Sequence, residues 1–264
     1  MGRIELRFCF RGKFFRKLVA RMSRTVETHF LPDQFDPGQL RGGWAVVIDV
    51  LRASTTIVHA LECGAVSVMP CETVEEARHL KAAASDRPLL GGERGGQMID
   101  GFDLGNSPAG YSREVVGGRR VIFTTTNGTR ALLRSRAAEH VLIGAFVNLS
   151  AVVLRLSRDA APVHLVCAGS DGQLSLEDVL FAGAVVARLV DAGDAIQIDE
   201  QSQLAMDHFR VHGGSTESLL HSLRVSRGGR HLQSLGMDSD IQLAGQIDLF
   251  DRVPEFLPQS GQVS

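Results

Sequence analysis

The chain contains little cysteine. Its four cysteines are scattered, with no Cys-x-x-Cys pair and no paired Cys/His spacing; they are Cys9, Cys63, Cys71 and Cys167. A disulfide framework and a structural zinc site are therefore not predicted. Scattered free cysteines are typical of a reducing compartment, so we expect a cytoplasmic protein.

Long apolar runs and the common phosphate motifs are also missing. No apolar run reaches the roughly 18 residues that a membrane-spanning helix needs, so no membrane span is predicted. The chain has neither the Gly-Lys-Ser/Thr of a P-loop nor the GxGxxG of a dinucleotide-binding turn. Its composition, 44% hydrophobic and 22% charged, is that of an ordinary globular protein.

Positive charge is in excess at the N-terminus alone. Residues 1–24 hold eight Lys/Arg and one acid, which leaves 20 bases and 29 acids for the rest of the chain. We interpret residues 1–24 as a disordered basic extension, with a membrane or partner tether as the alternative. The acidic remainder disfavours nucleic-acid binding, and any anionic ligand must be held by local groups.

Short apolar, β-branched runs alternate with amphipathic stretches along the rest of the chain. This alternation predicts an α/β fold with a mostly parallel sheet covered by helices on both faces, a three-layer α/β/α arrangement. We expect two similar α/β halves, residues 25–150 and 151–264. The chain from Pro258 onward is polar and is predicted to be disordered.

A strand followed directly by a helix is predicted at residues 45–61, and the junction between them is polar. Asp49 falls at the carboxyl end of the strand, where ligands bind in open α/β sheets. Arg52, Ser54 and Thr55 follow; an arginine and two hydroxyls suit a phosphate, and the carboxylate suits a divalent cation. The alternative interpretation is that Asp49 or Ser54 caps the helix.

A second strand, residues 121–125, ends in threonines and an Asn-Gly turn before a helix. Thr125, Asn127, Gly128 and Thr129 present hydroxyls, an amide and a close-approaching backbone at the start of that helix. Such groups form phosphate cradles, so a second phosphate-binding turn is predicted. A helix cap with a tight turn is the alternative.

Residues 91–108 form the longest glycine-rich stretch of the chain and are predicted to be a loop. The stretch is not linker-like, because it carries Glu93, Arg94, Asn106 and Ser107. Loops of this length in compact domains are usually functional, which favours a site loop over a surface loop whose polar side chains bond their own backbone.

A third polar turn follows the apolar run 164–168 and leads into a helix that begins with two acids. Ser175 and Asp178 match a capping box, so capping is the alternative for Asp178, whereas the box does not need Glu177. Asp238 and Asp240 are interpreted as exposed; binding is the less favoured reading for them. All three turns could meet at one edge of the sheet.

With those turns in view, the sequence resembles the 2-phosphosulfolactate phosphatase family over about Trp44 to Asp240. Six short stretches in the same order carry the resemblance: VVIDVLRASTTIV, GGERGG, GFDLGNSP, TTTNGTRAL, VCAG with SLED, and SRGGRHLQSLGMDSDI. The resemblance implies an α/β/α fold of two related halves. It also implies a magnesium-dependent hydrolase that converts 2-phospho-3-sulfolactate to 3-sulfolactate and phosphate, a step of coenzyme M biosynthesis.

Residue roles follow as hypotheses from the resemblance and the residue types together. Direct attack by water is preferred over a covalent phosphoenzyme, because the second aspartate used by haloacid-dehalogenase phosphatases and a Cys-x5-Arg loop are both missing. The assigned groups are Asp49, Arg52 and Glu93 for catalysis; Asp49, Glu93, Glu177 and Asp178 for Mg²⁺; Ser54, Thr55, Thr125, Asn127, Gly128 and Thr129 for phosphate; and Arg94, Asn106 and Ser107 for the sulfonate or carboxylate.

Two other functions stay open at this point. The first is a phosphatase of another small phosphorylated 2-hydroxy acid, because the groups that hold phosphate say little about the distal anion. The second is a non-catalytic binder of an anionic metabolite. In each case the partner is a small anionic molecule, and a homo-oligomer is an open alternative to a monomer.

Overall fold

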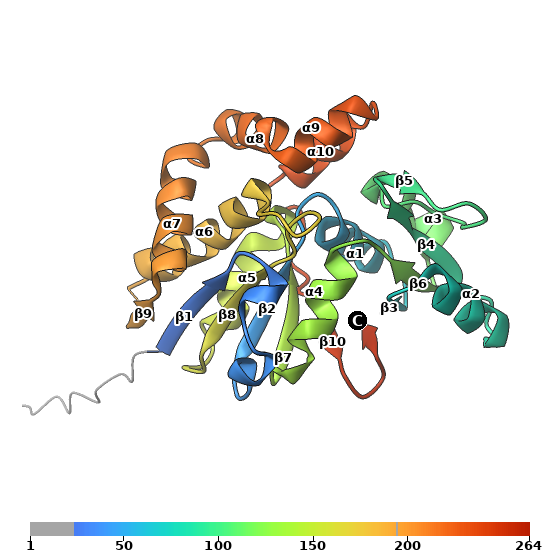
Figure 1. Cartoon of the computed structure of the whole chain (residues 1–264), viewed down its shortest axis with the longest axis horizontal. Helices are drawn as coiled ribbons and strands as arrows, with labels where there is room; N and C mark the ends of the chain where they lie inside the picture. The colour runs from blue at the N-terminus through green and yellow to red at the C-terminus, as the bar shows by residue number, and fades with distance from the viewer. Residues whose placement is uncertain (1–23, 194) are drawn as a thin grey trace, which may run out of the picture.

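The computed structural model describes residues 24–193 and 195–264. Their strands form a single 11-stranded sheet in the order β5-β4-β6-β3-β11-β10-β7-β2-β8-β1-β9 (Figure 1). Most neighbouring strands are parallel, which confirms the predicted α/β class.

The sheet contains two parallel groups of strands. One group comprises β7 (His140–Gly144), β2 (Trp44–Ile48), β8 (Val163–Cys167), β1 (Arg24–His29) and β9 (Ile196–Ile198). The other comprises β4 (Leu89–Arg94), β6 (Arg120–Thr124) and β3 (Ser67–Pro70). Between them lie β10 (Glu255–Leu257) and β11 (Gln262–Val263), whose three successive antiparallel pairings make the two groups run in opposite directions.

Strand β2 shows why the sheet is covered on both faces. Val46 and Ile48 belong to a hydrophobic core that includes α5 (Leu149–Leu156) and α6 (Leu176–Asp191). Ala45 and Val47 belong to a second core, which includes α1 (Ala53–Glu62) and α4 (Gly128–Arg134). Since successive side chains of a strand point to opposite faces, the sheet is the middle of three layers, as predicted.

The remaining helices complete the two outer layers and form an arm above the sheet (Figure 1). Side-chain caps define several starts, such as Thr73 accepting from the backbone N–H of Glu76. The bounds are α2 Val74–Ala83, α3 Arg113–Val116, α7 Glu200–His212, α8 Thr216–Val225, α9 Arg227–Ser234 and α10 Asp238–Ala244, and the short strand β5 is Gln97–Met98.

Strands from both sides of residue 150 are neighbours in the sheet. Strand β8 lies between β2 and β1, although it comes from the second of the two predicted halves. The division at residue 150 stays a prediction. Of the predicted basic extension, residues 1–23 lie outside the described residues, while Arg24 begins β1 and donates from its buried side chain to the carbonyls of Leu156 and Asp159.

The expected loop at residues 91–108 is partly a strand, so its assignment as a loop throughout was wrong. Residues 91–94 continue β4, which pairs with β6. A Cβ at Gly91 would lie 2.4 Å from the Tyr111 hydroxyl, and one at Gly92 would lie 2.0 Å from the carbonyl oxygen of Thr124. The glycines therefore mark a close approach of the backbone and not a flexible loop.

The chain end was also predicted wrongly, because residues 262–263 form β11 and not a disordered terminus. Phe256 of β10 and Val263 of β11 are buried in the core that contains α1 and α4. Strand β10 is three residues long and pairs with β7, and β11 is two residues long and pairs with β3. These pairings order the chain end. Short strands held by distant partners give little local signal.

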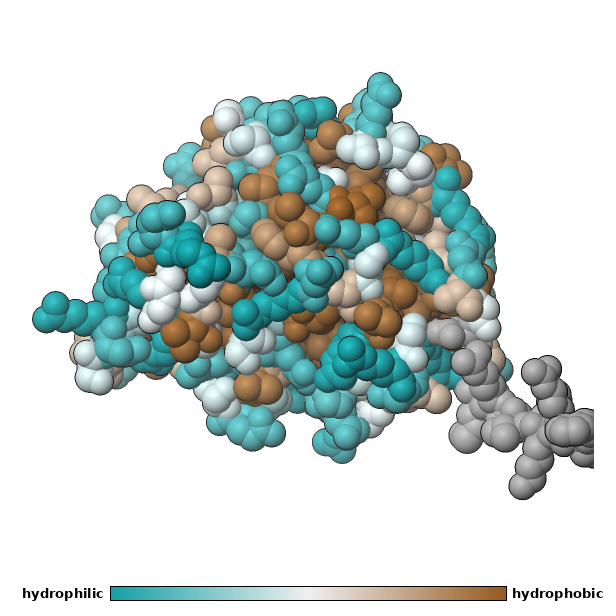
Figure 2. Space-filling view, turned by 180° about the vertical axis from the view of Figure 1, so that it is seen from behind, coloured by the Kyte–Doolittle hydropathy of each residue, from teal (hydrophilic) through white to brown (hydrophobic). Residues whose placement is uncertain are grey.

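Hydrophobic side chains also reach the surface of the molecule. On the back face they gather in patches interrupted by hydrophilic groups (Figure 2). Exposed hydrophobic side chains of the described residues, without regard to face, include Leu154 on α5 and Leu204 and Val211 on α7. Among the described residues, no helix combines the length and apolar character needed to cross a bilayer. A homo-oligomer stays a prediction.

Candidate active site

A cavity of about 310 Å³ lies where the segments that follow β2, β6 and β8 converge with the starts of α6 and α9. The three polar turns predicted from the sequence therefore do meet. The lining residues are Asp49, Leu51, Arg52, Glu93, Gly95, Gly96, Asn106, Thr126, Asn127, Gly169, Ser170, Asp171, Ser175, Glu177, Asp178, Arg227, Gly228, His231 and Leu232.

Asp49 lies at the carboxyl end of β2 and is 8% exposed. Its Oδ1 accepts the backbone N–H of Ala53 at 3.1 Å, so it does cap α1 while lining the cavity. Burial, with smaller contributions from the carboxylates of Glu93 and Glu177, raises the pKa of Asp49 to about 7, against the opposing effects of the Ala53 N–H and of Arg52. The free carboxylate is therefore costly here without a cation.

Two further acids reach the cavity from the first turn of α6. Asp178 is fully engaged, because its two oxygens accept the N–H groups of Val50 at 2.9 Å and Gly169 at 3.1 Å. Burial, followed by the charges of Asp49 and Glu177, raises the pKa of Asp178 well above its usual value. These bonds tie β2 and the turn after β8 to α6, so Asp178 holds the site together.

Glu177 differs from Asp178 in having a carboxylate oxygen without a partner. Its Oε2 is buried and accepts no hydrogen bond from any group of the described residues. Burial raises the pKa of Glu177, against the opposing effects of nearby polar groups and of the Arg227 charge. A buried acceptor left unpaired is costly, which indicates a missing cation or donor.

Glu93 joins two turns of the site. Its carboxylate accepts the N–H of Gly96 at 2.7 Å and the N–H of Thr126 at 2.9 Å. The turn between β4 and β5 is thereby fixed to the turn between β6 and α4. Glu93 lines the cavity, and its bonds give it a positioning role there, while its predicted roles in catalysis and Mg²⁺ binding stay predictions.

The predicted phosphate-binding residues separate into two sets. Thr126, which was not singled out, and Asn127 line the cavity. Thr125 and Thr129 instead bond one another, with the N–H of Thr125 donating to Thr129 Oγ1 at 3.1 Å and the N–H of Thr129 to Thr125 Oγ1 at 3.3 Å. Both are buried, so the helix-cap alternative describes these two threonines better.

Ser54 and Thr55 also lie outside the cavity lining. The Ser54 hydroxyl accepts the N–H of Asp49 and donates to the carbonyl of Val47. The Thr55 hydroxyl donates to the carbonyl of Val50 at 2.8 Å. Both side chains are buried, and they fasten α1 to the end of β2. Their predicted contact with phosphate has no counterpart in this arrangement, because the backbone takes up the hydroxyls.

Gly128 has a clear steric reason to be glycine. A Cβ at this position would lie 2.6 Å from the Cβ of Ala53 and 2.7 Å from Oδ2 of Asp49. The first residue of α4 thus touches both the start of α1 and the carboxylate. This close approach brings the two polar turns together, whereas the sequence predicted an approach to phosphate at Gly128, which does not line the cavity.

Arg52 lines the cavity and is held from two sides. Its Nη1 donates to Oδ2 of Asp240 at 2.6 Å and its Nη2 to the carbonyl of Gly96 at 2.6 Å. Ser107 donates to the other oxygen of Asp240 at 2.7 Å. Asp240, which was interpreted as exposed, is 2% exposed and orients Arg52. Ser107 supports this ion pair and does not line the cavity.

The predicted residues for the distal anion are only partly placed at the cavity. Asn106 lines it, and Oδ1 of Asn106 is buried without a hydrogen-bond partner among the described residues. Arg94 does not line it, because its guanidinium donates to the Glu72 and Glu93 carbonyls and to the Thr124 hydroxyl. Its position on β4 directs Arg94 to these acceptors, and its contact with the distal anion stays a prediction.

Sequence reasoning missed two cavity residues from α9. Arg227 donates to Oδ2 of Asp171 at 3.3 Å, and His231 Nε2 lies 3.1 Å from the carbonyl of Gly95. Both line the cavity, to which they add a cation and a titratable ring. The signal in the sequence that points to them is the cluster of bases in the stretch SRGGRHLQ.

The site acids suit a divalent cation held by few protein ligands. Among the described residues, the one group of three His/Cys/Asp/Glu ligand atoms within 4.8 Å of one another lies elsewhere, so the four acids do not form a closed cage. Mg²⁺ commonly binds one or two carboxylates and completes its shell with waters and substrate phosphate. Asp49 and Glu177 fit that pattern best, because Glu177 keeps an unpaired oxygen.

The fold and the cavity define an α/β protein in which four acids and two arginines line one cavity, at the point where the polar turns converge. The family model for 2-phosphosulpholactate phosphatase matches residues 29–258, and the chain belongs to this family. It is therefore a phosphatase, a phosphoric monoester hydrolase.

Several bacterial proteins, each called a probable 2-phosphosulfolactate phosphatase, are similar over most of their length. One from Symbiobacterium thermophilum is 40% identical over 85% of this chain and 95% of its own. One from Deinococcus radiodurans is 41% identical over 88% and 93%. One from Thermotoga maritima is 43% identical over 80% and 87%. The family-model match over residues 29–258 includes every residue that lines the cavity.

Proposed function

We propose that the protein hydrolyses 2-phospho-3-sulfolactate to 3-sulfolactate and phosphate with the help of Mg²⁺. The observation that carries the proposal is the lining of the cavity. Asp49 and Glu177, with its unpaired oxygen, line the same cavity as Arg52 and Arg227. The printed names of the relatives supply the substrate. A small substrate with three anionic groups needs both a cation and several donors.

Asp49 and Glu177 are the proposed Mg²⁺ ligands. When bound, the ion would neutralise charge on the phosphoryl oxygens and position the attacking water. Asp178 and Glu93 support the ligands from outside, because their oxygens already accept backbone N–H groups. Of the four predicted ligands, Asp49 and Glu177 are therefore the two that we propose to bind the ion.

The basic side of the cavity is the proposed binding surface for the substrate's anions. Arg227 replaces Arg94 in this role, since its side chain lines the cavity and makes long bonds of 3.3 Å that a stronger anion could displace. Asn106 and His231 offer further polar groups. Arg52, fixed by Asp240, supplies positive charge next to the reacting phosphoryl group.

We further propose direct attack by water on phosphorus, with cleavage of the ester P–O bond and protonation of the released sulfolactate oxygen. The reaction would be a step of coenzyme M biosynthesis in a host that makes this cofactor. The cytoplasm is the proposed location, with which the free thiols of Cys63, Cys71 and Cys167 are consistent.

Phosphate release from a substrate panel tests the proposal. The panel contains 2-phospho-3-sulfolactate, 2-phospholactate and 2-phosphoglycerate, each with Mg²⁺ and with EDTA. The highest kcat/KM on the sulfonated compound supports the proposed substrate. Equal or higher kcat/KM on a non-sulfonated acid supports the alternative phosphatase. Tight binding without phosphate release supports the metabolite binder and contradicts the proposed chemistry.

A further inference from the structure

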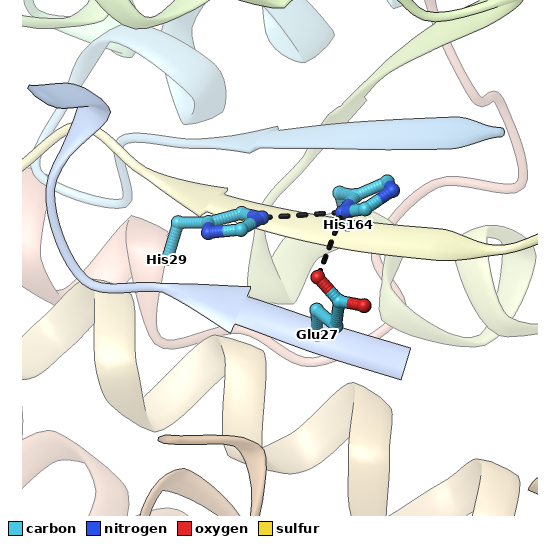
Figure 3. Close-up of side chains that lie close together, drawn as sticks. All are labelled: Glu27, His29 and His164. Atoms are coloured by element: carbon cyan, nitrogen blue, oxygen red, sulfur yellow. Dashed lines mark hydrogen bonds and ion pairs between the residues drawn. The ribbon is translucent and has the colours of Figure 1, made fainter. Parts of the chain in front are cut away.

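Two histidines and a glutamate lie together on β1 and β8, away from the cavity. His29 and Glu27 are two residues apart on β1 and so share one face of the sheet, and Glu27 pairs in register with His164 of β8. The two imidazole rings point toward each other and the carboxylate points toward His164 (Figure 3). Their ligand atoms all lie within 4.8 Å of one another.

The distances suit one small metal ion. His29 Nε2 lies 3.2 Å from His164 Nδ1, and His164 Nδ1 lies 3.7 Å from Oε2 of Glu27. Ligand atoms bound at 2.0–2.1 Å to a tetrahedral ion lie about 3.3–3.4 Å apart. The third pair, His29 Nε2 and the Glu27 carboxylate, lies within 4.8 Å, so the partly exposed Glu27 side chain has to turn toward His29 for all three atoms to surround one ion.

The surroundings favour a cation over a charged histidine pair. Burial is the main cause that lowers the pKa of His29 to about 4, and burial also lowers the pKa of His164. Burial therefore disfavours the charged form of each ring, and metals bind the neutral form. The carboxylates of Glu27 and Asp199 add negative charge nearby, since each opposes the lowering at His164.

The group of two histidines and a glutamate is accessible to solvent and lies apart from the cavity. The two histidines are buried, but the Glu27 side chain is 40% exposed and connects the group to solvent. His164 pairs with Ala45 of β2, four residues before Asp49. At the rise of a strand this places the group about 13 Å from the acid cluster. The two sites therefore do not share ligands.

We propose that Glu27, His29 and His164 bind a late first-row divalent cation, Zn²⁺ in the first instance, with a fourth position open to water. Two imidazoles and one carboxylate are typical ligands of zinc, whereas Mg²⁺ prefers oxygen ligands. The ion cross-links β1 to β8 and so stabilises the folded chain. It takes no part in the proposed hydrolysis.

Cobalt titration of the full chain tests this site in excess Mg²⁺, which competes for oxygen-ligand sites. Wild-type protein freed of metal by EDTA is expected to take up one equivalent of Co²⁺ with visible d–d absorption, which Zn²⁺ then abolishes. Saturating Zn²⁺ is expected to raise Tm by about 5–10 °C. Neither readout depends on catalysis.

Four variants locate the ion. Glu27→Gln and His164→Gln are expected to weaken Co²⁺ binding at least about tenfold. If loss of the buried histidine unfolds the chain, the result for Glu27→Gln alone tests the site. His208→Gln is the matched control, because His208 and His212 form another neighbouring pair, on α7. Asp49→Asn is expected to keep the absorption, since it changes the other site.

The opposite results overturn the proposal. Absence of Co²⁺ absorption from the wild type means that the two rings form an ordinary buried hydrogen bond. Unchanged affinity in Glu27→Gln, or loss of the absorption in Asp49→Asn or His208→Gln, places the ion elsewhere.

Discussion

Arg52 and Asp240 form a buried ion pair, with 2.6 Å between Nη1 and Oδ2, although 188 residues separate them in the chain. The side chains of both are 3% exposed. Arg52 comes from the turn between β2 and α1, and Asp240 from the first turn of α10. The pair therefore fixes a cavity arginine to the helical arm above the sheet.

Removing Asp240 is expected to damage both stability and catalysis. Asp240→Ala leaves Arg52 buried without its partner, which costs about 3–5 kcal/mol in the free energy of unfolding. It should also lower kcat/KM, because Arg52 loses its orientation. Denaturant unfolding and phosphate release measure the two effects. Asp238→Ala is the control, since Asp238 pairs with Arg224 outside the cavity; equal effects of both variants would contradict the account.

Gly128→Ala tests the close approach of α4 to Asp49. The added Cβ would lie 2.7 Å from Oδ2 of Asp49, so the carboxylate or the helix must move. Overpacking of this kind costs about 1–3 kcal/mol, and phosphate release should fall at least about tenfold. Gly214→Ala serves as the control, because a Cβ there meets nothing within 4 Å. Full activity of Gly128→Ala would show that Asp49 need not stay in place.

Mg²⁺ affinity is expected to depend on pH through Asp49. Since burial and neighbouring acids raise its pKa to about 7, lowering the pH below 7 adds a proton that competes with the ion. Affinity should fall by about tenfold per pH unit below that point. Calorimetric titration with Mg²⁺ at pH 8, 7 and 6 measures this, and equal affinity at all three would contradict it.

Asp49→Asn supplies the matching stability experiment. In the unfolded chain the carboxyl has its usual pKa of 3.8, so between pH 3.8 and about 7 the folded state holds a proton that the unfolded state lacks. Stability from Asp49 is therefore gained as pH falls through 7. In metal-free protein at pH 8, Asp49→Asn is expected to raise Tm. An unchanged or lower Tm would mean that the buried carboxylate of Asp49 does not destabilise the folded chain.

Arg227 is expected to contribute to substrate binding. Arg227→Gln should raise KM for 2-phospho-3-sulfolactate at least about tenfold, because a hydrogen bond to a charged group contributes about 1.5–3 kcal/mol. The neighbouring Arg230→Gln is the control, since Arg230 is exposed and does not line the cavity. Steady-state kinetics measure KM for both variants. Equal KM values for Arg227→Gln and Arg230→Gln would mean that other residues bind the substrate's anions.

The sequence predicted those features that depend on neighbouring residues. Asp49 and Gly128 were found because a strand, a polar turn and a helix follow one another locally. The roles of Ser54 and Thr55 were harder to predict. A rotation of the helix by less than one turn decides whether a hydroxyl faces the cavity or a backbone carbonyl.

Long-range packing accounts for what sequence reasoning missed. Arg227 and His231 reach the cavity because α9 packs over it, which local periodicity cannot show. The pairing of His29 with His164 joins residues 135 apart on neighbouring strands. The strand at Gly91 and Gly92 had the composition of a loop, because close contact with the Tyr111 hydroxyl and with Thr124, respectively, requires glycine at these positions.

The most direct test of the central claim is phosphate release from 2-phospho-3-sulfolactate by the wild-type chain and by Asp49→Asn, each with Mg²⁺ and with EDTA. We predict turnover by the wild type that EDTA abolishes and Mg²⁺ restores, and a loss of at least about a hundredfold in Asp49→Asn. Turnover that survives EDTA, or that Asp49→Asn retains in full, would contradict the proposed magnesium chemistry at Asp49.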